Sequence, residues 1–459
     1  MPQGFGLIDY VGFAACLLFT GWALATNPLR LLLGLPFIVT AYFIAPLVTY
    51  QTPGKVIPLI LLGWMILTNR LNVIRSQHNA FILIGCLVFV NFAAALIIGG
   101  SGIRPIMRIL HYADLVGIFA FSVWACRKPQ GLQLAMWGLV ICAGIHGAYA
   151  LYQLFAFQFG LPFRAIVRGT NGGFSLAVSN GILRVNGLAD EPKRVAYLFF
   201  AGALAALYLA NTVRGFMRTA LRGGACVAGL LSFITLSGSF LGSLIIAIGT
   251  MAFFSIRLWK FFPVVILSVG LFVVISPRAV NYFSETLTSS MDDRLEEVSV
   301  GLDADRIYRQ EFFAQDLVQN DFTTLIFGLG LGRYNQVLHD RYGFGAGLAE
   351  NGSLLPLNSQ IFEVGFDLGL PGIVVLYIGS LFIFLRIRGS GLFAFYLRFI
   401  VLVVILQSIF VQSLYLGAFV LGVAVAFAEV QRNSRRVPRV GASSIKPGSQ
   451  LRPYARPLR

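Results

Sequence analysis

Charged side chains are scarce in this chain. Only 12% of its 459 residues are charged, whereas 57% are hydrophobic and the mean hydropathy is +0.79. About a quarter of the residues in a soluble globular protein are charged, so the composition excludes that class and predicts an integral membrane protein. The short alternating strands of a membrane β-barrel are also lacking, which leaves helices as the spanning elements.

Cysteine is rare too. The five cysteines fall in or at the ends of apolar segments, and none has the spacing of a zinc site. An odd number confined to such segments argues against a disulfide framework. We therefore expect neither disulfides nor a metal or other cofactor. The first apolar segment has no basic n-region and no clear cleavage site, so we expect a retained span rather than a signal peptide.

The apolar blocks are close to the roughly 20 residues that a helix needs to cross the hydrocarbon. We place them at residues 7–25, 30–49, 56–68, 80–100, 107–126, 132–157, 194–212, 219–236, 240–256, 261–276, 364–385, 392–409 and 412–429. The third block is short. The expected fold is an all-α polytopic membrane protein with about 12 to 13 transmembrane helices and a large extracytoplasmic loop that carries amphipathic helices.

Basic residues predict the orientation, because Lys and Arg of short loops are retained on the cytoplasmic side. Residues such as Arg70, Lys128 and Arg386 fall on one side, together with a C-terminal tail that has eight basic residues and no acidic one from Arg432 onward. The expected segments are N-terminal transmembrane helices (1–157), an extracytoplasmic loop (158–193), central transmembrane helices (194–276), a large extracytoplasmic loop (277–360), C-terminal transmembrane helices (361–430) and a basic, disordered cytoplasmic tail (431–459).

The formal charge of +16 does not indicate a nucleic-acid partner. Most cations flank helices or lie in the tail, where topology and attraction to anionic membrane lipids explain them. Cations outside the membrane need another explanation, and the first outer loop has five: Arg164, Arg168, Arg184, Lys193 and Arg194. Guanidinium groups suit a pyrophosphate, because they pair with phosphate oxygens bidentately. The alternatives are contact with lipid headgroups or pairing with Asp190 and Glu191.

The larger loop combines a predicted amphipathic helix with a glycine-rich turn. Asp303 or Asp305 can cap a helix to about Asn320, and Arg306 and Arg309 would project from nearby points on its surface. Such a helix would lie along the outer membrane surface, with its arginines near a lipid-linked phosphate. Glycines 328, 330 and 332 lack the βαβ context of a dinucleotide site, so we expect a tight turn that approaches another backbone or a ligand.

Ionisable residues inside the predicted spans are functional candidates, because they are costly in hydrocarbon unless they face a partner or a cavity. These residues are His111, Asp114, His146, Glu363 and Asp367. His111 and Asp114 are three apart on one helix face and can satisfy each other or relay protons. Glu363 and Asp367 follow the large loop directly, so we expect them near the outer interface, where they would contribute to a site.

Taken together, the motifs resemble the O-antigen ligase and polymerase superfamily of bacterial inner-membrane glycosyltransferases, over roughly residues 180 to 425. Four pieces match in the family's order: Arg184 ahead of Gly187 and Pro192; Leu236-Ser-Gly-Ser239 at the end of a span; Asp305-Arg306 leading into Gly328-Leu-Gly-Leu-Gly332; and Asn358-Ser359, nine residues before Gly369-Leu-Pro-Gly372.

The resemblance implies a polyprenyl (undecaprenyl) pyrophosphate-linked glycan as donor. An acceptor hydroxyl attacks the anomeric carbon, and the lipid pyrophosphate leaves. The residues implied to be catalytic are Arg184, Arg306 and Asn358. Those implied to bind substrate are Arg168, Arg309, Glu191 and Glu363. Loss of Arg184 or Arg306 is expected to cost on the order of a few kcal/mol of transition-state stabilisation.

One departure decides between branches of the superfamily. The ligase branch has a histidine where this chain has Asn358. An amide cannot take a proton near neutral pH, so Asn358 is able to orient an acceptor hydroxyl but not to act as general base. We therefore expect a polymerase that joins lipid-linked repeat units for exopolysaccharide, capsule or O-antigen. Chain-length regulators and export proteins are further expected partners.

Three alternatives stay open. The first is an O-antigen ligase that transfers glycan to lipid A core. The second is a transporter of the same lipid-linked glycan, although the sequence has no convincing internal repeat of the kind common in transporters. The third is a scaffold that lost activity with the histidine. If the reaction needs a base, Glu191, Glu350 and Glu363 are candidates of equal standing.

Overall fold

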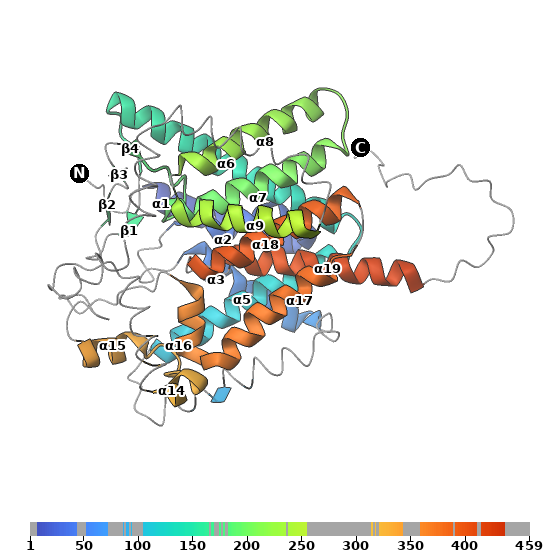
Figure 1. Cartoon of the computed structure of the whole chain (residues 1–459). Helices are drawn as coiled ribbons and strands as arrows, with labels where there is room; N and C mark the ends of the chain where they lie inside the picture. The colour runs from blue at the N-terminus through green and yellow to red at the C-terminus, as the bar shows by residue number, and fades with distance from the viewer. Residues whose placement is uncertain are drawn as a thin grey trace.

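The protein is a bundle of apolar helices (Figure 1). The structure, a computed structural model, describes residues 7–43, 52–71, 86, 89–90, 93, 104–164, 167–168, 174–175, 178–179, 182–235, 237–254, 314, 317, 321–342, 359–388, 391–410 and 415–436. Within this part, seven helices are long and apolar enough to cross a membrane, and three shorter apolar helices accompany them. The chain is therefore an all-α polytopic membrane protein, as the composition predicts.

The first half of the chain contributes α1 (Leu7–Thr26), a 3-10 turn η1 (Pro28–Arg30), α2 (Leu31–Thr40), α3 (Pro53–Leu67), α5 (Arg104–Cys126) and α6 (Gly131–Phe159). The central part adds α7 (Pro192–Ala210), α8 (Phe216–Ile234) and α9 (Gly238–Phe254). Then follow α14 (Phe322–Phe327), α15 (Tyr334–Tyr342), α16 (Gln360–Ile373), a π-helical turn η4 (Val374–Ile378), α17 (Gly379–Arg386), α18 (Leu392–Phe410) and α19 (Tyr415–Arg436).

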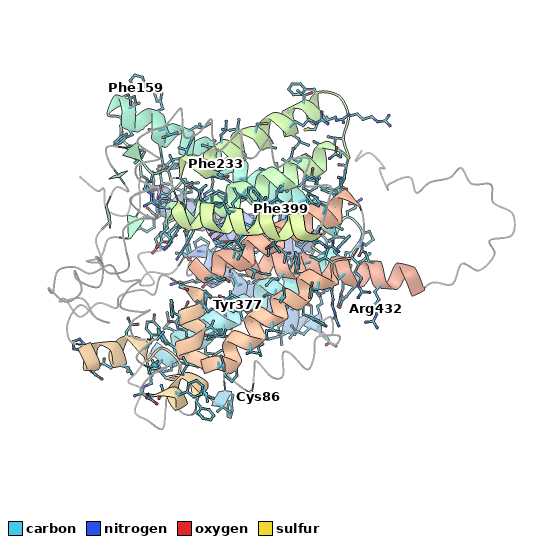
Figure 2. The ribbon with its side chains drawn as sticks, in the orientation of Figure 1. Cys86, Phe159, Phe233, Tyr377, Phe399 and Arg432 are labelled. Carbon is cyan, nitrogen blue, oxygen red and sulfur yellow. The ribbon has the colours of Figure 1, made fainter. Side chains whose placement is uncertain are left out.

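Four two-residue strands lie between α6 and α7. β1 (Val167–Arg168) pairs with β2 (Phe174–Ser175), and β3 (Val178–Ser179) pairs with β4 (Ile182–Leu183), both antiparallel. In Figure 1 these strands and α15 lie at the left end of the bundle, whereas the last helix ends at the right. Figure 2 likewise places Phe159, the last residue of α6, and Arg432 of α19 at opposite ends.

Basic residues that follow α3 and α5 lie at the end of the bundle where α19 terminates. Residues of α3 and α5 pair in the same order along both helices, as Trp64 with Trp124, and α5 pairs with α19 in the same way, as His111 with Tyr415 and Arg127 with Glu429. These three helices therefore run parallel. Arg70 and Arg127 directly follow α3 and α5, so these two cations lie at the common end of the three helices.

Glycines allow close approach between neighbouring helices. A Cβ on Gly138 of α6 would come within 2.0 Å of the Leu32 carbonyl oxygen of α2, and one on Gly117 of α5 would come within 2.4 Å of the Pro58 carbonyl oxygen of α3. Small residues at such contacts let membrane helices pack backbone to backbone. These contacts hold α2 against α6 and α3 against α5.

The helix ends agree with the expected spans within about three residues for α1, α5 and α6. The expected helix over 30–49 is interrupted after Thr40, where α2 ends, and residues 44–49 lie outside the described residues. Ala41 is extended, and the Tyr42 N–H donates to the Leu188 carbonyl at 2.9 Å rather than to its own helix. The expected span over 261–276 and most of that over 80–100 lie outside the described residues.

Candidate functional site

Part of the expected first outer loop is buried in the bundle. The segment 182–190 lies against α6, where the Gly187 N–H donates to Gln153 Oε1 at 2.9 Å and the Leu188 N–H donates to His146 Nδ1 at 3.3 Å. Gly187 has a φ of 56°, and a Cβ there would lie 3.0 Å from the His146 carbonyl. His146 is near the middle of α6, so this segment reaches deep between the helices.

His146 has partners at both ring nitrogens. Nδ1 accepts from Leu188, which leaves Nε2 as the donor to Thr40 Oγ1 at 3.2 Å. The ring thus ties the end of α2 to the segment 182–190. Its position explains why a histidine is tolerated within a span, and this role is structural.

Arg164 is also a structural cation. It pairs with Asp9 of α1 and donates to the Tyr42 carbonyl, and its guanidinium carbon lies 5.5 Å from the centre of the Phe43 ring. Burial lowers the pKa of Arg164, and the Asp9 carboxylate opposes this shift. We expected Arg164 to be one of several outward-facing cations that bind a pyrophosphate, whereas in the structure it pairs with Asp9.

The residues around the start of α7 pair with one another. Arg194 Nη1 lies 2.6 Å from Asp190 Oδ2, and Lys193 Nζ lies 3.3 Å from Glu191 Oε2. Arg194 Nε is also 3.9 Å from Glu191. Of the two explanations for these cations, pairing with Asp190 and Glu191 therefore accounts for Lys193 and Arg194.

Arg184 lies beside the turn that joins α8 to α9. Its Nε donates to the Thr235 carbonyl at 3.4 Å. Ser237 follows in the same turn and caps α9, since its hydroxyl accepts from the Phe240 N–H at 3.3 Å. Arg184 thus lies beside the turn that contains Ser237 of the second motif, about 50 residues away in the sequence.

The most concentrated charge inside the bundle is centred on Arg108 of α5. Arg108 pairs with Glu363 and, through Nε at 3.0 Å, with Asp367 Oδ2, both on α16. The two acidic side chains are fully buried and Arg108 is 13% exposed. Glu363 and Asp367 thus share one cation in the protein interior, and their expected position near the outer interface stays a prediction.

Hydrogen bonds extend this group to other helices. Asp367 accepts from the Tyr112 hydroxyl at 3.2 Å and from the Gly332 N–H at 2.9 Å. Arg108 Nη2 donates to the Tyr334 hydroxyl at 3.1 Å. We call Arg108, Tyr112, Tyr334, Glu363 and Asp367 the Arg108 cluster. It joins α5, α15 and α16.

The glycine-rich turn packs directly on a break in α16. Gly328 and Gly330 have φ of 79° and 89°, and Gly369 has φ 67° and ψ −166° inside α16. A Cβ on Gly369 would lie 2.1 Å from the Ile326 carbonyl oxygen. The Leu329 N–H donates to the Phe366 carbonyl at 2.6 Å. The expectation of a tight turn that approaches another backbone is confirmed.

His111 and Asp114 of α5 share a hydrogen-bonding partner on α19. His111 Nδ1 lies 2.8 Å from the Tyr415 hydroxyl, and Asp114 also bonds to Tyr415. We expected His111 and Asp114 to satisfy each other, whereas both use the same tyrosine of α19.

Gln360 and Glu363 differ from the other buried polar residues of the described ranges, because both terminal atoms of each side chain lack a hydrogen bond. Gln360, the first residue of α16, is fully buried, yet neither of its amide atoms is bonded. Both carboxylate oxygens of Glu363, three residues later, also lack a hydrogen bond and have only the ion pair with Arg108. Buried polar atoms without partners are uncommon and mark places where a ligand can supply the missing bond.

Several predicted site residues lie outside this description. Arg306, Arg309 and Asn358 are not among the described residues, and neither is the expected helix of the large loop apart from residues 314 and 317. Arg168 belongs to β1, where its backbone pairs with Phe174. In the ranges that are described, no group of three or more His, Cys, Asp or Glu is arranged to hold a metal ion.

Comparisons with known proteins add no assignment. No protein-family model matches the chain, and no curated protein matches it. The case for a function therefore depends on the motifs and on the way in which the fold brings them together.

Sequence reasoning missed Arg108 and Tyr112. Arg108 could have been identified from the sequence, because it is an arginine inside an apolar segment that was expected to start at residue 107. Such a residue needs an acidic partner within the membrane. Glu363 and Asp367, four apart on another predicted span, were the pair with matching charge.

Proposed function

We propose that the protein is a polysaccharide polymerase, a metal-independent membrane glycosyltransferase that joins undecaprenyl pyrophosphate-linked repeat units at the outer face of the bacterial inner membrane, with its C-terminus in the cytoplasm. The observation that carries the proposal is the contact between the glycine-rich turn 328–332 and Gly369. These belong to two of the four motifs shared with the O-antigen ligase and polymerase superfamily, and they meet backbone to backbone.

The positions of the cations also support a transferase. A glycosyl transfer from a lipid pyrophosphate needs cations to meet the charge on the leaving group. Arg184 is half-buried and lies beside the α8–α9 turn, at the end of the bundle where the strands lie. The carbonyl of Thr235 can hold the Arg184 side chain in position for such a phosphate. Arg306 remains the second cation of this proposal.

The contacts of two candidate bases support one of them over the other, whereas Glu350 lies outside the described residues. Glu191 is engaged by Lys193 and Arg194. Both carboxylate oxygens of Glu363 lack a hydrogen bond, and its ion-pair partner Arg108 is shared with Asp367. We therefore favour Glu363 over Glu191 as the residue that receives a hydrogen bond from an acceptor hydroxyl.

The test is to incubate the purified protein with an undecaprenyl pyrophosphate-linked repeat unit, with and without lipid A core, and to resolve the products on a gel. A polymerase yields a ladder without the core, and the ladder is lost in Arg306→Ala. Product that appears only with the core would instead identify a ligase despite Asn358. Absence of product with the cognate unit would contradict both.

One observation favours a second candidate, a transporter of the same lipid-linked glycan. α16 and α17 form one apolar span that is broken at Gly369, close to the buried charges of the Arg108 cluster. Broken helices near buried charges are common at transporter binding sites. Movement of a labelled lipid-linked unit across vesicles without polymer formation would favour this candidate.

A further inference from the structure

Arg70 lies against two tryptophan rings where α3 and α5 end. Its guanidinium carbon is 4.4 Å from the centre of the Trp64 ring and 4.6 Å from that of Trp124. Asn69 has a φ of 51°, and the Arg70 N–H donates to the Met65 carbonyl at 2.8 Å, so the chain folds back at the end of α3. The turn and the two rings thus hold this cation in place without a carboxylate.

Lys128 places a second cation near the ring of Trp124. Its ammonium nitrogen is 5.9 Å from the centre of the Trp124 ring, and the side chain is exposed. Within the described ranges, neither Arg70 nor Lys128 has a side-chain hydrogen bond or an acidic partner. Cation–π contacts leave N–H groups free to donate to an anion.

The acidic residue described at this end of the bundle, Glu429, already has a basic partner. Glu429 of α19 pairs with Arg127, whose Nε donates to Glu429 Oε2 at 2.5 Å. Arg127 and Lys128 are adjacent in sequence, yet only Arg127 receives a carboxylate within the described ranges. The two cations at Trp124 therefore form an uncompensated positive site.

Apolar side chains lead from this site along the outside of α3. Leu67 is 88% exposed and Ile66 is 56% exposed, immediately before the turn that carries Arg70. In a membrane protein such outward-facing residues contact acyl chains. Tryptophan and basic residues beside them are typical of the membrane–water interface, where the lipid headgroups lie.

We propose that Arg70, Lys128 and the indoles of Trp64 and Trp124 form a binding site for the headgroup of an anionic phospholipid, with its acyl chains along Leu67. The guanidinium pairs with the phosphate in a fork, and the ammonium adds a second charge. A zwitterionic headgroup would bring its own cation against these two. The site lies at the end opposite the strands, so it stands independently of the proposed glycosyl transfer.

The test uses the full-length protein in an uncharged detergent, titrated with phosphatidylglycerol or with phosphatidylcholine. Native mass spectrometry counts the lipids retained, and thermal unfolding reports stabilisation. We expect phosphatidylglycerol to bind more tightly than phosphatidylcholine. The double change Arg70→Gln and Lys128→Gln is expected to lower its affinity roughly thirtyfold, because each cation near the surface contributes about a factor of five.

Two further variants keep the test decisive. Lys128→Gln alone changes an exposed side chain that the fold does not need, and it is expected to lower the affinity about fivefold. The control, Arg218→Gln with Arg222→Gln, removes the same total charge from the exposed start of α8 and is expected to leave binding unchanged. Equal loss in this control, equal binding of both lipids, or full competition by soluble glycerol phosphate would overturn the proposal.

Discussion

Arg108 and Arg127 lie near opposite ends of α5, and each pairs with acidic residues of a C-terminal helix. Arg108 and its two carboxylate partners are nearly or fully removed from solvent, whereas Arg127 and Glu429 are 27% and 21% exposed. Breaking a buried pair leaves an uncompensated charge and costs about 3–5 kcal/mol, but an exposed pair contributes about 0–1 kcal/mol. The same pairing chemistry therefore has a different consequence at each end of the helix.

Arg108→Gln is expected to have the largest effect. The substitution leaves Glu363 and Asp367 buried without a cation, so the free energy of unfolding should fall by about 3–5 kcal/mol. Denaturant or thermal unfolding in detergent micelles measures the loss. Adding Glu363→Gln and Asp367→Asn to the variant removes the stranded charges and should recover much of the stability. If Arg108→Gln alone were as stable as the natural protein, the Arg108 cluster would not be the buried network described above.

Gly369→Ala is expected to come next. The φ and ψ of Gly369 lie in a region open essentially to glycine alone, and the added Cβ would meet the Ile326 carbonyl. The expected loss is about 2–4 kcal/mol. Gly379→Ala in α17 is the matched control, because the site has helical angles and no atom within 4 Å of an added Cβ. That change should be neutral or slightly stabilising, and an equal loss at both sites would refute the packing of the turn on α16.

Tyr112→Phe tests one hydrogen bond of the Arg108 cluster. The variant removes the hydroxyl that donates to Asp367 but leaves the ring and the ion pair. Asp367 keeps Arg108 and the Gly332 N–H, so the expected loss is about 1 kcal/mol. A loss as large as that of Arg108→Gln would mean that the hydrogen bond, rather than the guanidinium, stabilises Asp367.

Arg127→Gln is expected to have the smallest effect, at most about 1 kcal/mol. Salt should reduce this effect further, since exposed pairs are screened. The corresponding loss for Arg108→Gln should change little with salt. The free energy of unfolding of both variants is measured at low and at high ionic strength. An equal salt dependence would contradict the statement that the Arg108 pairs are buried and the Arg127 pair is exposed.

The positions of the helices could be predicted from the sequence better than the points at which they end or are interrupted. Apolar length alone placed α1, α5 and α6, because hydrocarbon thickness sets a helix length. It did not predict the end of α2 at Thr40, since that end depends on Leu188, a residue distant in sequence that bonds to Tyr42. The burial of segment 182–190 was missed for the same reason.

The candidate site was predicted in part. Composition singled out Glu363 and Asp367, because carboxylates are rare in spans, and the glycine turn was recognised from residue type. The partners were not predictable, since one sequence does not say that α5 faces α16. Tyr112 and Tyr334 became visible only through packing, and so did the pairing of Arg108 with α16. The roles of Arg306, Arg309 and Asn358 stay predictions.

The measurement that tests the account most directly is the rate of ladder formation by Arg184→Gln, compared with Arg222→Gln, at matched thermal stability. If Arg184 meets the charge of the leaving pyrophosphate, its variant should lose about a hundredfold in rate, and the exposed Arg222 variant should keep the natural rate. An undiminished ladder from Arg184→Gln would contradict the assignment of this arginine to the leaving pyrophosphate.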